Sequence, residues 1–382
     1  MNIGYFFWGH LTDKLGEKTK NTPDGNAWYS SSIIYELHKR KHKIYGMSIN
    51  RDKDDIEQFG IKKCFSSFEQ KKRIQAYNII NWVTWLTTYN SLASKWPRLD
   101  VLLLEWRFPI FGRNIVKDYY KESWQPDLKM QNILLDYYSK TNTKIIIFDL
   151  DYKLTSKDED NLLKLTNNIV ILETAKKPKF YKIKRYTVEI PFWIKNSKIK
   201  KSKENLLNKD LVYIGSNYER EETINKYIFP YSKKYPFCVW FYGNWRNYPE
   251  VVEKIYCDLK WRDIQYHFRV GHDNFYKIYG DSFVCPLLAK QEYYQNGFMT
   301  ARIQECLYFG AIPIGFKEHF KIEQYLPKKL IAETDLDVEK IIKYLKSITV
   351  KQRNQLRKKL WKHLKFMDVK YFIDKIEELK NE

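Results

Sequence analysis

Short apolar runs alternate with amphipathic stretches twice along this 382-residue chain, and this repeated alternation limits its fold more than any other feature. Such runs, rich in Ile, Val, Leu and aromatic residues, are typical of buried parallel strands joined by crossover helices. The first series predicts strands at 3–8, 43–48, 101–106, 144–150 and 169–173, with a helix at 28–41. The second predicts strands at 211–214, 237–242, 264–269, 282–288 and 311–315, with helices at 220–228, 249–259, 274–279 and 298–309. We therefore expect an α/β protein with two Rossmann-like domains facing each other across a cleft.

A polar, lysine-rich stretch separates the two series and predicts an interdomain linker at 196–209. It divides an N-terminal domain, 1–195, from a C-terminal domain, 210–350. Apolar residues at helical spacing continue to the end of the chain, among them Leu356, Leu360 and Leu364. We expect C-terminal helices there, with 351–382 packing back on the N-terminal domain.

The chain carries 67 Lys and Arg residues against 46 Asp and Glu, a net charge of +21 that would concentrate a polyanion near its surface. Nucleic acid and an anionic membrane are the candidate partners, although AT-rich coding would also favour lysine. The five cysteines form no C-x-x-C pair and are expected to be reduced core residues in a cytoplasmic protein. Neither a secretory leader nor a membrane-spanning segment is expected, because no apolar run approaches ~18 residues.

Two strands of the second series end in residue types that bind phosphate. Gly215 and Ser216 follow the first strand, just before a helix, where backbone N–H groups could receive a phosphate, although an ordinary tight turn has the same sequence. The next strand ends in Gly243, Asn244 and Arg246, and a guanidinium there could pair with a diphosphate. Ligands of open α/β sheets bind at this edge, so the two loops support each other.

Arg302 and Glu305 lie three residues apart and share a face near the start of a predicted helix. A nucleotide-sugar site requires a cation for the diphosphate and a carboxylate for the ribose hydroxyls. A surface Arg–Glu ion pair is the alternative.

The strand at 144–150 leads into Asp149 and Asp151, and a carboxylate here could act as general base toward an acceptor hydroxyl. The Asp-x-Asp pattern could instead hold a metal, serve as a phosphatase motif like that of haloacid dehalogenases, or cap the loop. Lys153 disfavours the phosphatase. Three further residues near the end of the 101–106 strand could contact an acceptor or pair with one another: Glu105, Arg107 and Arg113.

No His or Cys residues have the spacing of a zinc site, so no metal site is expected, and no Walker A or G-x-S-x-G motif is present. Metalloprotease, kinase and serine-hydrolase activities are therefore disfavoured.

Taken in order, these segments resemble the GT-B glycosyltransferases, and most closely the phage DNA β-glucosyltransferases. The matching segments are IIIFDLD at 145–151, IPFWIK at 190–195, Gly215-Ser216 with Arg220-Glu221, FYGNWR at 241–246, and Phe298-x-Thr-x-Arg-x-x-Glu. The resemblance implies Asp151 as the catalytic base, with Arg220, Arg246 and Arg302 on the donor diphosphate. It also implies that Glu305 holds the ribose and that the loop at Gly271 receives uracil. Gln291 stands where the family has a sugar-contacting carboxylate.

The resemblance implies an inverting glycosyltransferase that moves a sugar, expected to be glucose from UDP-glucose, to a hydroxymethylated pyrimidine in double-stranded DNA. The base would flip out of the duplex, and the positive charge would offset that cost through phosphate contacts. A divalent metal could stimulate but would not be required, since arginines can neutralise the departing diphosphate. A monomer is expected, located in the host-cell cytoplasm if the protein is phage-encoded.

Two alternatives remain open. One is a GT-B enzyme that acts on a bacterial surface glycan, a lipid-linked sugar or a protein. The other is a DNA-binding protein on an inactive GT-B scaffold.

Overall fold

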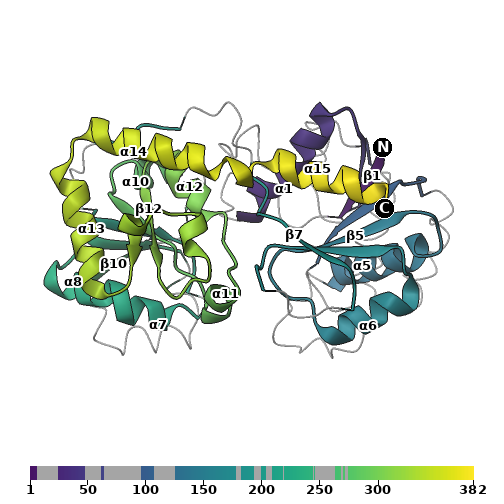
Figure 1. Cartoon of the computed structure of the whole chain (residues 1–382), viewed down its shortest axis with the longest axis horizontal. Coiled ribbons are helices and arrows are strands. Elements are labelled where there is room, and N and C mark those ends of the chain that lie inside the picture. The colour runs from purple at the N-terminus through teal and green to yellow at the C-terminus, as the bar shows by residue number, and fades with distance from the viewer. Residues whose placement is uncertain are drawn as a thin grey trace.

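The computed structural model describes residues 1–6, 25–47, 62–63, 96–106, 125–177, 182–192, 199–203, 209–217, 219–243, 245, 263–267, 270–271 and 274–382. These residues form two lobes that lie side by side, each built around one sheet (Figure 1).

The first sheet contains seven strands in the order β3-β2-β1-β4-β5-β6-β7, and all of their pairings are parallel. Its strands are β1 (Asn2–Phe6), β2 (Lys43–Gly46), β3 (Lys62–Lys63), β4 (Val101–Glu105), β5 (Lys144–Asp149), β6 (Ile169–Glu173) and β7 (Arg185–Thr187). The first six strands follow the 3-2-1-4-5-6 order of the Rossmann fold. The short edge strands β3 and β7 add to the five that the sequence predicts.

The second sheet contains six strands in the order β10-β9-β8-β11-β12-β13, again with parallel pairing throughout. Its strands are β8 (Leu211–Ile214), β9 (Val239–Tyr242), β10 (Ile264–His267), β11 (Val284–Pro286), β12 (Ile312–Phe316) and β13 (Ile331–Ala332). This is the same order as in the first sheet, so the prediction of two Rossmann-like units is confirmed.

The helices lie between the strands and after them. Those of the first lobe are α1 (Gly25–Lys39), α5 (Gln125–Tyr138) and α6 (Ser156–Leu165). Those of the second are α7 (Glu221–Thr223), the π-helical η2 (Ile224–Ile228), α8 (Phe229–Lys234), α10 (Phe275–Tyr279), α11 (Gln291–Gln295), α12 (Arg302–Phe309), and the 3-10 turns η5 (Ile322–Gln324) and η6 (Lys328–Leu330). The helix predicted at 249–259 lies outside the described residues.

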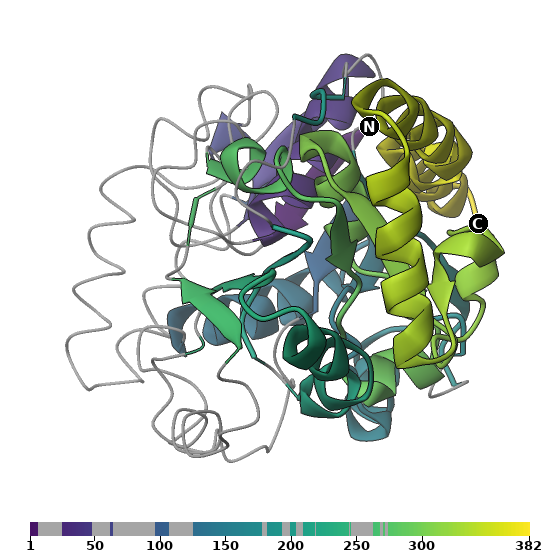
Figure 2. The same cartoon turned by 90° about the vertical axis from the view of Figure 1, so that its left-hand side faces the viewer.

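Three helices and a 3-10 turn close the chain: α13 (Asp335–Ser347), α14 (Val350–His363), η7 (Leu364–Met367) and α15 (Val369–Lys380). They lie together on one side of the molecule (Figure 2). Leu360 and Trp361 of α14 belong to the core of the second sheet. Phe372 and Ile376 of α15 belong instead to the core of the first sheet. Residues 351–382 were all expected to pack on the N-terminal lobe. In the structure α15 does so, whereas α14 packs on the second lobe.

The chain passes between the lobes twice at one place. Val369 N donates to Phe192 O at 2.9 Å, so the outgoing segment after the first sheet lies beside the returning segment before α15. Within the predicted linker, Ser202 is buried and its hydroxyl donates to Gly310 O at 2.7 Å. The described part of that linker thus packs on the second lobe.

No helix within the described residues is long and apolar enough to cross a membrane.

Candidate active site

Two glycine-containing loops touch at the carboxyl edge of the second sheet. Gly243 follows β9 with φ +146°, and a Cβ placed on it would lie 2.3 Å from Gly215 O, in the loop after β8. No side chain fits at that distance, and L residues rarely adopt this backbone conformation. Gly215 N also donates to Tyr242 O at 2.7 Å. Glycine at 243 therefore allows the two predicted phosphate loops to lie against each other.

The Arg302 side chain, at the start of α12, reaches this edge and is only 19% exposed. Its Nη1 lies 3.4 Å from the Tyr279 hydroxyl and 3.9 Å from Glu305 Oε2. Within the described residues, the contact with Tyr279 is the only hydrogen bond of a group that carries five N–H donors. A largely buried cation with so few acceptors is suited to receive an anion.

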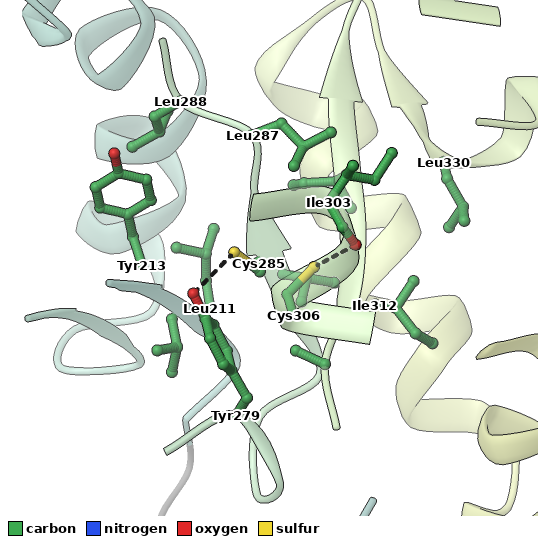
Figure 3. Packing of buried hydrophobic residues seen from close by; sticks show 14 of the residues in the cluster. Leu211, Tyr213, Tyr279, Cys285, Leu287, Leu288, Ile303, Cys306, Ile312 and Leu330 are labelled. Carbon is green, nitrogen blue, oxygen red and sulfur yellow. Dashed lines mark hydrogen bonds between the residues drawn. The ribbon is translucent and has the colours of Figure 1, made fainter. Parts of the chain in front are cut away.

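Tyr213, the third residue of β8, packs against two of the arginines predicted to bind the diphosphate. The Arg302 and Arg220 guanidiniums lie 4.7 Å and 5.7 Å from the centre of its ring. The side chain is fully buried, and its hydroxyl has no hydrogen-bond partner among the described residues. In Figure 3 this hydroxyl lies on the side of Leu288, away from Cys306.

The Tyr213 hydroxyl and the Arg302 guanidinium flank the same glycine. A Cβ placed on Gly215 would lie 2.7 Å from the hydroxyl oxygen and 3.0 Å from Arg302 Nη2. A buried hydroxyl without a partner costs about 1–3 kcal/mol, which an incoming acceptor such as a phosphate oxygen would recover. Tyr213 was not among the predicted site residues, because an aromatic residue within an apolar strand is typical of a core position.

Arg220 approaches the same loop from the start of α7. Its Nη1 donates to Ser216 O and its Nε donates to Leu288 O at 3.3 Å. The structure thus brings Gly215, Ser216, Arg220, Gly243, Arg302 and Glu305 together at one sheet edge.

The remaining donor-side candidates are placed less directly. Gln291 is the first residue of α11 and is partly buried. Gly271 is buried, and its carbonyl accepts from Asn274 N at 3.0 Å. Asn244 and Arg246 lie outside the described residues.

Asp151 follows β5 in a turn, and its side chain is 26% exposed. Its Oδ2 lies 3.3 Å from Lys153 Nζ, and its carbonyl accepts from the hydroxyl of Tyr293 in α11 at 3.0 Å. Because α11 comes after β11 of the other sheet, the carboxyl edges of both sheets meet here. A partly exposed carboxylate in this position can exchange a proton with a bound molecule.

Asp149 shapes this turn from beneath. Its two carboxylate oxygens accept from Lys153 N at 2.8 Å and from Leu154 N at 3.1 Å. Burial raises the pKa of Asp149 to about 6, although these two N–H groups favour the ionised form. The expectation that Asp149 faces an acceptor is therefore corrected: it holds the loop, which was one of the alternatives.

Glu105, at the end of β4, is also directed into the protein. It is fully buried and accepts from the hydroxyl of Tyr5 and, at 3.1 Å, from that of Ser30. The expectation that it contacts an acceptor is corrected for the same reason. Arg107 and Arg113 lie outside the described residues.

The part of the chain that the structure describes contains no group of three or more His, Cys, Asp or Glu residues that could hold a metal ion.

Solved structures resemble this chain over its full length. An alpha-glucosyltransferase in complex with UDP and a 13-mer DNA containing an HMU base matches with a TM-score of 0.64 at 12% identity, over 100% of both chains. The DNA-modifying enzyme beta-glucosyltransferase, studied with and without uridine diphosphoglucose, matches with a TM-score of 0.57 at 10% identity, over 100% of both chains. The beta-glucosyltransferase of T4 phage, in complex with UDP and Mn2+, matches with a TM-score of 0.58 at 12% identity, again over 100% of both chains.

No protein-family model matches the sequence, and no curated protein does. The structural matches show that the chain has the GT-B fold of the phage DNA glucosyltransferases, at low sequence identity.

Proposed function

We propose that this protein transfers glucose from UDP-glucose to the hydroxyl of a hydroxymethylated pyrimidine in double-stranded DNA, with inversion at the anomeric carbon. The observation that carries the proposal is the largely buried Arg302 guanidinium, with the Tyr213 hydroxyl beside it, at the carboxyl edge of the second sheet. These groups can donate hydrogen bonds to a diphosphate, and they lie at the sheet edge where Rossmann-like domains bind one.

On the donor side, Arg302 and Arg220 would bind the diphosphate and Glu305 the ribose hydroxyls. Both guanidiniums lie within 6 Å of the Tyr213 ring, so one diphosphate could reach both. Negative charge grows on the diphosphate as its bond to the sugar breaks, and fixed cations stabilise that charge. Arg246 would assist from the loop after β9, with Gly271 receiving the uracil and Gln291 the sugar.

On the acceptor side, Asp151 would act as the general base. Its carboxylate would take the proton of the hydroxymethyl group while the acceptor oxygen forms its bond to the anomeric carbon and UDP departs. Because UDP-glucose is an α-glycoside, attack from the opposite face yields the β-glucoside.

Two observations support DNA as the acceptor. The net charge of +21 favours a polyanion, and two solved structures of the same fold are DNA-modifying or DNA-bound glucosyltransferases. A base in a duplex must leave the stack to reach a partly buried carboxylate, so the enzyme would flip the nucleotide.

The test incubates the protein with UDP-glucose and duplexes that contain cytosine, 5-hydroxymethylcytosine or 5-hydroxymethyluracil, followed by mass spectrometry of the nucleosides. We expect a hexose-sized gain on one hydroxymethyl base, with β linkage by NMR. An α linkage would refute inversion. No gain on any duplex, with UDP-glucose still bound, would refute the DNA acceptor and direct attention to glycan, lipid or protein acceptors.

A substitution of Asp151, the proposed general base, distinguishes catalysis from donor binding. Asp151→Asn should abolish transfer and leave the affinity for UDP-glucose unchanged, because the carboxylate takes part only in proton transfer. Asp136→Asn is a suitable control, since that carboxylate pairs with Lys140 on the surface of α5 at 2.8 Å. Transfer by the Asp151 variant at the wild-type rate would disprove the assignment.

A further inference from the structure

We propose that Tyr293 is a positioning residue that holds the Asp151 loop against the donor-side helix α11. This inference rests on the proposed function, because it concerns how the proposed base is placed relative to the sugar. The hydroxyl of Tyr293 donates to the Asp151 carbonyl at 3.0 Å. The two residues are 142 positions apart in the chain and belong to different lobes.

The helix that carries Tyr293 also begins with Gln291, the residue expected to contact the sugar. Residues two apart on a short helix move together, since its backbone hydrogen bonds fix their separation. Helix α11 would therefore contact the sugar through Gln291 while it contacts the backbone of Asp151 through Tyr293.

A second set of hydrogen bonds joins the same two segments. Asn296 O, directly after α11, accepts from Lys176 N at 2.7 Å and from Lys177 N at 3.2 Å. Lys177 O in turn accepts from the hydroxyl of Tyr152 at 3.0 Å. Tyr152 directly follows Asp151. The loop that contains Asp151 and Tyr152, called the base loop here, is therefore joined to α11 in two ways: directly through Tyr293, and indirectly through Tyr152, Lys177 and Asn296.

Both ends of the contact are held in place. The ring of Tyr293 lies 4.2 Å from that of Phe298, which belongs to the core of the first lobe, and 4.6 Å from the Lys290 ammonium. On the other side, Tyr152 has φ +57°, a left-handed conformation that costs a non-glycine residue about 1–2 kcal/mol. The loop therefore adopts a conformation that its neighbours must stabilise.

This arrangement predicts an effect on the chemical step alone. A general base must lie within hydrogen-bond reach of the acceptor proton while the sugar is held for attack, and a small displacement is costly. The diphosphate site at Gly215 and Arg302 lies on other elements of the second lobe. Helix α11 also stays attached to that lobe without Tyr293, because the Tyr294 hydroxyl donates to Leu287 O at 2.9 Å. Donor affinity therefore does not depend on the contact between Tyr293 and Asp151.

The test is Tyr293→Phe in the full chain, which keeps the ring and removes the hydroxyl. We expect kcat for transfer to fall about tenfold, corresponding to about 1.4 kcal/mol. The KM for UDP-glucose and the affinity for UDP should stay within about twofold of wild type. Tyr325→Phe is the matched control, since its hydroxyl also crosses between the lobes, to Glu189 Oε2 at 2.9 Å, but does not contact the base loop.

A second measurement does not depend on activity. Amide hydrogen exchange at Lys153 and Leu154 should become faster in Tyr293→Phe and remain unchanged in Tyr325→Phe. The proposal is overturned if exchange does not change, if kcat is unaltered, or if both variants lose kcat equally. A wild-type protein that transfers no sugar would refute the proposed function, while the exchange data would still decide whether Tyr293 holds the loop.

Discussion

Tyr213→Phe should stabilise the free protein and weaken the binding of UDP. In the free protein the Tyr213 hydroxyl is buried without a hydrogen-bond partner among the described residues, so its removal relieves a desolvation cost of about 1–3 kcal/mol. The phenylalanine ring retains the packing on Arg302 and Arg220. At about 2.1 cal/mol/K per residue, the unfolding entropy of 382 residues is about 0.8 kcal/mol/K, so Tm should rise by about 1–4 °C.

Binding should change in the opposite direction, because the hydroxyl would donate to a phosphate oxygen of UDP. A charge-assisted hydrogen bond contributes about 1.5 kcal/mol or more, so we expect Kd for UDP to rise about tenfold. At a UDP concentration 100 times the wild-type Kd, ligand stabilisation would then fall from about 2.7 to about 1.4 kcal/mol. Calorimetric titration and thermal unfolding with and without UDP measure both effects.

Tyr294→Phe is the matched control, because that buried hydroxyl does have partners. It donates to Leu287 O at 2.9 Å and accepts from Ala289 N at 3.1 Å, so its loss should lower Tm with and without UDP. If Tyr213→Phe lowered Tm and left Kd unchanged, the hydroxyl would have a partner in the free protein and no contact with the ligand. That result would contradict an anion site at the Tyr213 hydroxyl.

Two further predictions concern the loops and the core. Gly243→Ala should abolish UDP binding and lower the free energy of unfolding by about 2–5 kcal/mol, because the new Cβ would lie 2.3 Å from Gly215 O. Calorimetry and denaturant unfolding test this prediction, and a variant with unaltered binding and stability would contradict the structure. Burial raises the pKa of Glu173 to about 7, although Arg185 Nη1 lies 2.9 Å from its Oε2. Because the folded protein binds this proton more tightly than the unfolded chain, the contribution of Glu173 to folding stability is complete below pH 4.5 and is lost as the pH rises to 7. Relative to wild type, Glu173→Gln should therefore gain about 3 kcal/mol between those pH values in denaturant titrations, and a difference independent of pH would reject the shift.

The sequence predicted the buried central strands well because their apolar runs are local. The strands at 169–173 and 211–214 have the predicted bounds, and every residue in them is buried. The edge strands β3, β7 and β13 were missed, because these segments do not lie in an apolar run of the length that indicates a buried strand and form only by pairing with a neighbour. The helix predicted at 298–309 begins at Arg302, because Phe298 instead packs in the core of the first lobe.

For the candidate site, the sequence predicts the positions of residues along the chain but not the directions of their side chains. The sequence places Gly215, Gly243 and Arg302 at strand ends or a helix start, and parallel order brings such positions to one edge. It cannot say which way a side chain at a strand end points. Glu105 and Asp149 occupy strand ends, yet distant hydroxyls and the following loop hold them inside the protein.

The repeated α/β order, the excess positive charge and the residue types available for phosphate and proton chemistry can all be read from the amino-acid sequence. These properties follow from composition and from periodicity over a few residues. Two contacts become visible only in the folded protein: the Tyr213 hydroxyl is buried beside Arg302, and the Tyr293 hydroxyl contacts the Asp151 loop. Such contacts join residues from separate elements, and their geometry depends on how those elements pack.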